Sequence, residues 1–318
     1  MSEIHSRIKK RFFCFPYELC NGRKVSIVEL RMLEDKDTNL VYIADTLPER
    51  RADIYNRLTK LLSDFGIDVR FLNRTKDIWC RDYMPVQVDK SLFVKYHYAP
   101  DYMWKSPKYM NDITDSTEIC NELGVKCKET DLIIDGGNVV LCGDKVVMTD
   151  KVFTENRYEK GDKLLLDKLS ELFEHEVITI PWGSPGTCDP DSDKDVFGHA
   201  DGFIKYAGGN HILMSNVRET APTQTDTIRK KLESNGYSVT ELTYDVALPN
   251  VNYNWAYINF LQVGSHIILP TFGIDEDSQA ASQVHHVFPS CTLHTFRCRN
   301  LANWGGALHC ITWNVYMD

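Results

Sequence analysis

The chain has 318 residues, of which 43% are hydrophobic and 25% are charged, the proportions of an ordinary globular protein. Its formal net charge of −9 argues against nucleic acid and anionic membrane surfaces as partners. No stretch approaches the ~20 apolar residues of a membrane span. The N-terminal segment holds only a four-residue apolar run, which is too short for the core of a signal peptide.

Ten cysteines are spread along the chain without a C-x-x-C pair or a short cluster with histidine. A structural zinc site with four ligands is therefore not expected. In a chain without an export signal, such cysteines are typical of reduced thiols, so we expect a cytoplasmic protein. The sequence leaves the number of subunits open, a homo-oligomer included.

The first predicted elements are strands at 25–30 and 40–44 and a helix at 48–65, whose apolar residues recur at three- and four-residue spacing before Gly66. Further helices are expected at 115–124, 159–174, 219–236 and 276–288. Short extended runs follow several of the helices, at 68–72, 176–180, 237–242 and 291–296.

Four hairpins of one design lie between these helices. In each, β-branched and aromatic residues stand on both sides of a turn made of Gly, Asp, Asn, Lys or Ser, which is the usual hairpin signal. They occupy 84–97, 138–149, 202–215 and 258–270.

The repeated order of strand, motif, hairpin and helix predicts an α/β protein built from about five ββαβ units that close into a ring. The tail, 303–318, is rich in Gly and Trp, which favours a buried closing strand that pairs back towards the start of the chain. No linker composition divides the sequence. We therefore predict a single domain, 1–318, with a two-lobed protein as the alternative.

The residue types that carry chemistry gather just before the hairpins and in the tail. Asp82, Asp135, His199, Asn259 and Cys310 are separated by 53, 64, 60 and 51 residues. This near-constant interval matches the structural repeat, so a closed ring would bring the five positions together at one end of the ring.

Strand geometry then predicts which of these side chains share a face. Successive strand residues point to opposite faces, so His199 and Asp201 are expected on one face. By the same rule, His309 is expected to point away from Cys310. A Cys/His pair would then use His199 rather than the adjacent histidine.

Each candidate also has a purely structural interpretation. Cys310 alone would be a core thiol, and Asp82 alone a surface or capping carboxylate. The His199-x-Asp201 pair is equally typical of a metal-ligand pair or a core contact. Their conjunction at equivalent positions favours function, whereas Asp135, Asn138 and Asn259 are balanced between the two interpretations.

Five ordered motifs carry a resemblance to a known family. They are WxRDxxP from Trp79, (D/E)GGN from Asp135, GHxDG around His199, YxNF with a following ILPxFG strand around Asn259, and GGxxHCIT around Cys310. Over 77–314 the chain resembles the agmatine deiminase and bacterial peptidyl-arginine deiminase family, of the guanidino-group-modifying superfamily. The resemblance implies a five-bladed β/α propeller and a cysteine hydrolase that acts on a guanidino group without a metal or other cofactor.

The resemblance and the chemistry assign the same roles. A guanidinium is planar and permanently charged, so Asp82 and Asp201 are the expected bidentate acceptors. Cys310 is the expected nucleophile, forming a thiouronium intermediate, and His199 the expected acid and then base. The remaining expected substrate-binding residues are Trp79, Asp135, Asn138 and Asn259.

Several segments depart from the family pattern and leave the substrate open. Met84 replaces a glycine, Asp135 replaces the usual glutamate, and Cys310 is followed by Ile-Thr-Trp-Asn. The segment 98–104 is also changed, and it is a candidate wall for the substrate's tail. An acidic loop at 185–195 is a candidate cover for the site.

The small-molecule substrate implied is agmatine, whose product would feed putrescine and polyamine synthesis, or a related arginine-derived guanidine. A peptidyl-arginine deiminase and an amidinotransferase of the same fold are the alternatives within the superfamily. Outside it stand a metal-dependent hydrolase that uses His199, Asp201 and Asp135, and a non-catalytic binding propeller.

Overall fold

The computed structural model describes residues 32–105, 107–182, 198–216, 218–219 and 221–318, which all belong to one compact unit, 31–318. The expected strand at 25–30 and the acidic loop at 185–195 lie outside the described residues. In the part of the chain that is described, no helix is long and apolar enough to cross a bilayer.

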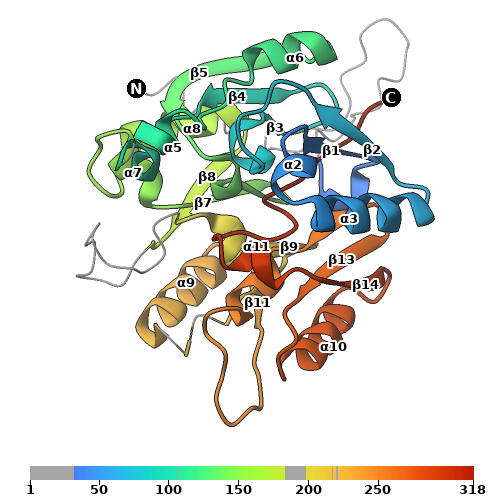
Figure 1. The fold of residues 1–318 in the computed structure, drawn as a ribbon. Coiled ribbons are helices and arrows are strands. Elements are labelled where there is room, and N and C mark those ends of the chain that lie inside the picture. The colour runs from blue at the N-terminus through green and yellow to red at the C-terminus, as the bar shows by residue number, and fades with distance from the viewer. Residues whose placement is uncertain (1–31, 106, 183–197, 217, 220) are drawn as a thin grey trace, which may run out of the picture. The chain divides into compact units, whose positions relative to one another are not determined.

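Fifteen strands of the described residues form five three-stranded sheets (Figure 1). In each sheet the middle strand pairs antiparallel with one neighbour and parallel with the other. The sheets, with the middle strand second, are β3 (Val86–Gln87), β4 (Phe93–His97) and β5 (Cys127–Ile133); β6 (Val140–Cys142), β7 (Lys145–Thr149) and β8 (Glu176–Ile180); β9 (Ile204–Gly208), β10 (His211–Met214) and β11 (Ser238–Glu241); β12 (Leu261–Val263), β13 (His266–Thr271) and β14 (Thr292–Arg297); and β15 (Trp313–Val315), β1 (Leu40–Ala44) and β2 (Asp68–Leu72).

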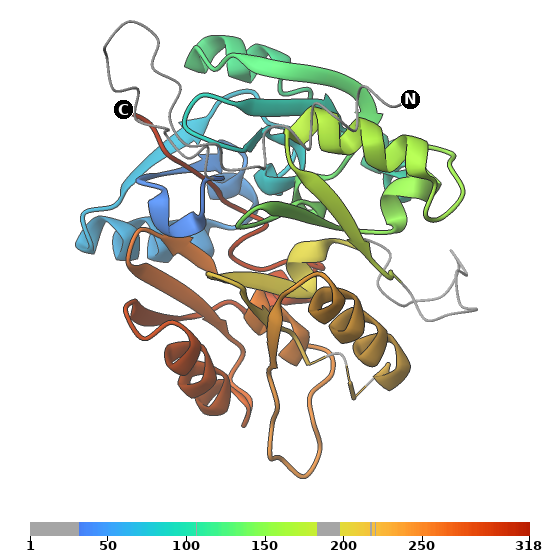
Figure 2. The ribbon, with the colours of Figure 1, turned by 180° about the vertical axis from the view of Figure 1, so that it is seen from behind.

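The four predicted hairpins are confirmed as the antiparallel pairs β3–β4, β6–β7, β9–β10 and β12–β13. In the fifth sheet the antiparallel pair joins distant parts of the chain, because Leu40 of β1 lies opposite Val315 of β15. Figure 2 shows this C-terminal segment, in red, passing beside the blue β1. The predicted return of the last strand towards the start of the chain is confirmed.

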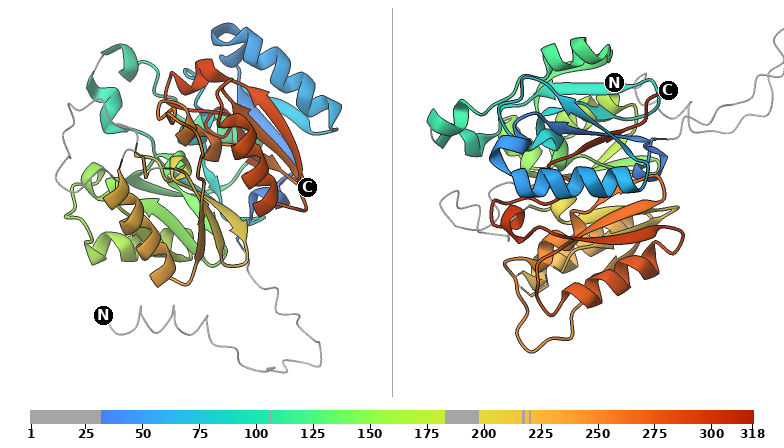
Figure 3. Two further views of the ribbon diagram at one scale, coloured as in Figure 1. Left: turned by 90° about the horizontal axis from the view of Figure 1, so that it is seen from below. Right: turned by 45° about the vertical axis from the view of Figure 1, so that its right-hand side comes forward.

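Longer helices link each middle strand to its parallel neighbour and cover the sheets, as the views of Figure 3 show for α3 and α10. Helix α3 (Ala52–Asp64) buries Ile54, Leu58 and Leu62, spaced four apart, in one apolar cluster with Ile43 of β1. Each such side chain contributes roughly 1.5–3 kcal/mol. The others are α6 (Thr117–Leu123), α8 (Lys163–Phe173), α9 (Pro222–Ser234) and α10 (Asp277–Val287).

Except for α2 (Leu47–Arg50), which lies at the start of the helix expected at 48–65, the short helices were not predicted, and several of them hold the site. The short helices are α2, α4 (Cys80–Tyr83), α5 (Pro107–Met110), α7 (Lys151–Glu155) and α11 (Arg299–Ala302), with 3-10 turns η1 (Asp35–Asp37), η2 (Asp101–Lys105), η3 (Gly136–Asn138), η4 (Ala200–Gly202) and η5 (Asn254–Ile258).

Two predictions of regular structure are wrong in detail. The helix expected at 48–65 is broken at Arg51, whose φ of −149° is not helical, so that α2 and α3 are separate. The tail expected as a strand at 303–318 is extended only from Trp313 to Val315. Before it the backbone turns, since Gly305 has a φ of 91° and Thr312 N donates to His309 O.

Candidate active site

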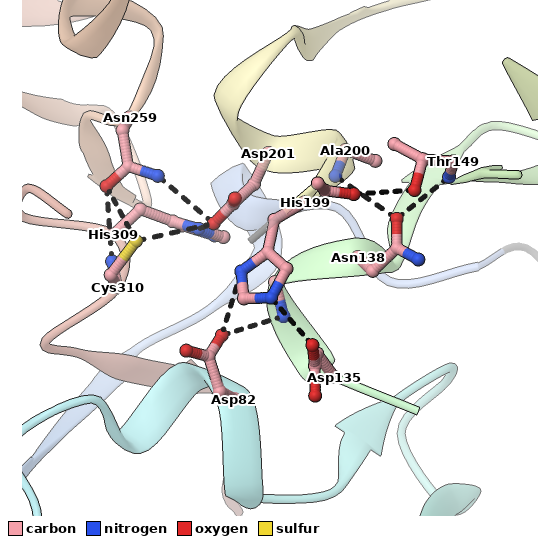
Figure 4. Close-up of polar contacts among 12 residues, drawn as sticks. Asp82, Asp135, Asn138, Thr149, His199, Ala200, Asp201, Asn259, His309 and Cys310 are labelled. Carbon is pink, nitrogen blue, oxygen red and sulfur yellow. Dashed lines mark hydrogen bonds and ion pairs between the residues drawn. The ribbon is translucent and has the colours of Figure 1, made fainter. Parts of the chain in front are cut away.

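The candidate site is assembled from equivalent positions of the five sheets, directly before the first strand of a hairpin or before β15 (Figure 4). All of its expected polar side chains are buried. They are Asp82 in α4, Asp135 before η3, His199 before η4, Asp201 within η4, Asn259 after η5 and Cys310 before β15.

His199 lies between two carboxylates. Its Nε2 is 2.8 Å from Asp135 Oδ2, and its Nδ1 is 3.5 Å from Asp82 Oδ1. Burial lowers the pKa of His199, but Asp82 and Asp135 outweigh it and raise the pKa to about 9. Burial raises the pKa of Asp82 to about 7, with His199 acting in the opposite direction. The imidazole is therefore held charged at neutral pH.

Asn259 positions the thiol of Cys310. Its Oδ1 accepts hydrogen bonds from Ala307 N at 3.1 Å and from Cys310 N at 3.3 Å. The same oxygen lies 3.2 Å from Cys310 Sγ. Its Nδ2 donates to Asp201 Oδ2 at 3.1 Å, so that one buried amide joins the turn that carries the thiol to the neighbouring carboxylate.

His309 contacts Asp201 and does not follow the strand alternation that we expected. Asp201 Oδ2 is 2.7 Å from His309 Nδ1 and 3.8 Å from Cys310 Sγ, so both neighbours in sequence reach one oxygen. Alternation fails because 303–312 is not a strand. Burial, Arg81 and Lys205 lower the pKa of His309 to about 4. A neutral His309 donates through Nδ1, which keeps the pKa of Asp201 low despite burial.

Gly137 marks the point on which the other groups converge. A Cβ built on this glycine would lie 2.7 Å from Asp82 Oδ1, 2.7 Å from His199 Nδ1 and 3.3 Å from Asp201 Oδ1. Gly137 N also donates to Asp82 Oδ1 at 3.2 Å. Two carboxylates and an imidazole therefore face each other across the bare Cα of one glycine.

Burial and two carboxylates oppose ionisation of the Cys310 thiol. Burial raises its pKa well above the ordinary value, and the Asp201 and Asp82 carboxylates raise it further. A positive charge close to the sulfur would favour the thiolate.

Asn138 and Trp79 have contacts that organise the site's frame. Asn138 Oδ1 accepts from Thr149 N at 2.8 Å and from Ala200 N at 3.2 Å, which ties the second hairpin to η4. The Trp79 ring packs against Gly306, where a Cβ would meet it closely. A direct contact of Asn138 or Trp79 with substrate stays a prediction.

Lys151 was not predicted by the sequence analysis, although it lies beside the site. It begins α7, is buried, and its Nζ lies 3.3 Å from Asp135 Oδ2 and 3.0 Å from Glu155 Oε1. The sequence signal that could have pointed to Lys151 was a Lys and a Glu four residues apart, directly after the second hairpin. Tyr102, of the segment proposed as a wall, lies beside His199, with the two ring centroids 6.3 Å apart.

A cavity of about 220 Å³ is lined by Asp201 and His309 and also by Arg81, Lys205 and Asn314. His199 and Cys310 are not among its lining residues, so this cavity is separate from the gap at Gly137. Within the described ranges, no group of three or more His, Cys, Asp and Glu side chains is placed to hold a metal ion.

In sequence the chain is similar to proteins named agmatine deiminase. An agmatine deiminase of Pseudomonas putida is 23% identical over 216 residues, 57% of this chain and 56% of the relative. Relatives from Mycoplasma capricolum and Mycoplasma mycoides align over 60% of their own length, so the chain spans less than two thirds of these curated relatives.

Solved structures show that the fold is shared. The agmatine deiminase of C. jejuni has a TM-score of 0.69 at 17% identity and covers 90% of this chain and 96% of its own. That of Enterococcus faecalis has a TM-score of 0.65 at 17% identity, with 88% and 93% covered. The model of the Porphyromonas-type peptidyl-arginine deiminase family matches residues 22–315. The chain therefore belongs to the Porphyromonas-type peptidyl-arginine deiminase family.

Proposed function

We propose that the protein is a guanidino deiminase, which hydrolyses a guanidino group to a ureido group and ammonia. The observation that carries the proposal is the convergence of Asp82, Asp201 and His199 on the gap above Gly137, with Cys310 Sγ 3.8 Å from Asp201 Oδ2. We also infer that 1–318 is one catalytic domain and that the five sheets are the blades of a five-bladed β/α propeller.

The charges of the gap suit a guanidinium. Asp82 and Asp201 offer carboxylate oxygens to a planar cation whose N–H groups form a fixed fork. Asp201 Oδ2 already accepts from His309 and Asn259, which leaves Oδ1 for the ligand. Oδ1 is also the Asp201 oxygen that faces the gap at Gly137.

The reaction then uses the cation to activate the thiol. Its charge offsets the carboxylates that raise the pKa of Cys310, so the thiol gives its proton to solvent and the thiolate forms a bond to the guanidino carbon. The bond from this carbon to one terminal nitrogen breaks, and protonated His199 gives its proton so that ammonia leaves. The first half-reaction therefore leaves a covalent thiouronium intermediate on Cys310.

Neutral His199 completes the cycle as a base. It takes a proton from water, whose oxygen adds to the same carbon, and the bond between carbon and Cys310 Sγ then breaks. The ureido product leaves, and His199 is charged again. One histidine whose pKa is set by two carboxylates suffices for both proton transfers.

Agmatine or a related arginine-derived guanidine is the proposed substrate. Support comes from relatives named agmatine deiminase, including a C. jejuni Cys-to-Ser variant solved with substrate bound. A peptidyl-arginine substrate is the second candidate, because the family model carries that description. An amidinotransferase is the third, since one of Microseira wollei shares the fold with a TM-score of 0.55.

The test is a screen for ammonia and ureido product over agmatine, free arginine and peptidyl-arginine, with and without an added amine acceptor. We expect ureido product without acceptor, and a requirement for acceptor would favour the amidinotransferase. Full activity after exhaustive chelation would eliminate the metal-dependent hydrolase. Equal labelling of Cys310 and the buried Cys142 by a haloacetamidine would favour the non-catalytic propeller and overturn the proposal.

A further inference from the structure

Lys151 is a buried cation whose charge the proposed reaction does not use. Its side chain is 1% exposed, and its Nζ lies 3.0 Å from Glu155 Oε1, 3.3 Å from Asp135 Oδ2 and 3.5 Å from the half-exposed Asp101 Oδ1. Burial lowers the pKa of Lys151, but Asp135 and Glu155 outweigh it and raise the pKa. An ammonium buried at this depth is retained only with such partners.

One carboxylate oxygen joins Lys151 to the acid–base histidine. Asp135 Oδ2 is 2.8 Å from His199 Nε2 and 3.3 Å from Lys151 Nζ, so imidazole and ammonium share it. Asp135 Oδ1 is buried and has no hydrogen-bond partner among the described residues. With Nε2 engaged in this way, Nδ1 is the nitrogen of His199 that faces the gap at Gly137.

We propose that Lys151 is a positioning residue that holds Asp135 against His199 Nε2 and, by its charge, makes the imidazole release its proton more readily. This inference rests on the proposed function, in which His199 must act first as an acid and then as a base. Without Lys151, the Asp135 carboxylate would interact with the His199 imidazolium alone and would hold the imidazole proton more tightly.

The direction of the effect follows from the charges that surround His199. Among the main groups that set the pKa of His199, carboxylates predominate and Lys151 is a cation that lowers it. Glu155 is a second carboxylate paired with Lys151. Burial and Asp135 raise the pKa of Glu155 to about 8, so in alkaline solution Glu155 is ionised and partly offsets the charge of Lys151. Among the described residues, titratable groups that act on His199 are Asp82 from α4, Tyr102 from η2, Asp135 before η3, Lys151 from α7 and Asp201 from η4.

Two substitutions should therefore move the titration of His199 in opposite directions. Lys151→Met keeps most of the side-chain volume and removes the charge, so the midpoint should rise by about one pH unit. Glu155→Gln leaves Lys151 less compensated, so the midpoint should fall. Lys151→Arg keeps the charge and should restore the wild-type midpoint. Lys160→Met, which removes a half-exposed lysine paired with Asp150, is the matched control and should leave it unchanged.

The measurement is an NMR titration of the His199 ring in the full chain without substrate, with the signal assigned by its loss in His199→Asn. The alkaline limb of kcat/KM, which reports groups of the free enzyme, should shift with this midpoint in each variant. A folded Lys151→Met variant with an unchanged or lowered midpoint would overturn the proposal. If Lys151→Met does not fold, an unchanged midpoint of the His199 titration in Glu155→Gln would overturn the proposal. A protein that releases no ammonia from any guanidine refutes the proposed function, while the NMR midpoints still decide the role of Lys151.

Discussion

Gly137→Ala adds one methyl group at the point where the candidate site is tightest. The new Cβ would lie 2.7 Å from Asp82 Oδ1 and 2.7 Å from His199 Nδ1, whereas ordinary contact begins at 3.4 Å. The two side chains must therefore retreat by about 0.7 Å, the difference of these distances. No positive φ is recorded for Gly137, so alanine meets steric overlap there without backbone strain.

The displacement should affect activity far more than stability. A misplacement approaching 1 Å at reacting groups costs about 10²-fold in rate, so kcat/KM should fall by roughly that factor. Overpacking costs roughly 1–3 kcal/mol, of which about 0.4–1 kcal/mol is offset because alanine restricts the unfolded chain. The net loss is small beside a typical domain stability of about 5–15 kcal/mol.

Gly202→Ala is the matched control, because this glycine lies three residues after His199 and a Cβ there meets nothing within 4 Å. The assay is ammonia release at several substrate concentrations, with urea unfolding measured on both variants. We expect a loss of about 10²-fold for Gly137→Ala and less than about twofold for Gly202→Ala. A folded Gly137→Ala variant with wild-type kcat/KM would show that the substrate does not lie between Asp82, His199 and Asp201.

Three more predictions follow from the same geometry. The pH profile of kcat/KM should be bell-shaped, falling below about pH 7 as Asp82 becomes protonated and above about pH 9 as His199 loses its proton; a flat profile from pH 6 to 10 would contradict these assignments. Cys310→Ser should lower kcat by about 10³-fold or more while calorimetry still detects substrate binding, and near-normal turnover would exclude the covalent step. Asn259→Ala leaves the Ala307 and Cys310 N–H groups without their acceptor, so the free energy of unfolding should drop by about 1–3 kcal/mol in a denaturant titration, whereas no change would mean that water replaces the amide.

The hairpins could be predicted because their information is local. Turn residues such as Gly143 and Gly264 have φ values of 72° and 54°, which alanine-like residues rarely adopt, and β-branched residues flank them. The break at Arg51 could not be predicted from the periodicity. Arg51 makes a contact distant in sequence, since its guanidinium lies 2.9 Å from the ring centroid of Trp304. Tertiary contacts of this kind override helical periodicity.

The members of the site were predictable as residues, but their mutual geometry was not. The near-constant spacing placed Asp82, His199 and Cys310 in equivalent units without showing which atoms meet. Strand alternation assigned His309 to the wrong direction because the tail turns before it extends. Lys151 was missed because it belongs to none of the five motifs. The buried Asp135 carboxylate with which it pairs comes from another segment of the chain.

The arrangement implies that the substrate's charge controls both the start and the end of the proposed cycle. Asp82 and Asp201 raise the pKa of the Cys310 thiol, so a neutral molecule in the gap would leave the sulfur protonated. A guanidinium offsets both carboxylates and allows the thiolate to form. The ureido product is neutral, so it loses the charge-assisted contacts, which are roughly twice as strong as neutral ones. Cys310 then regains its proton, and the clamp that selects the substrate releases the product.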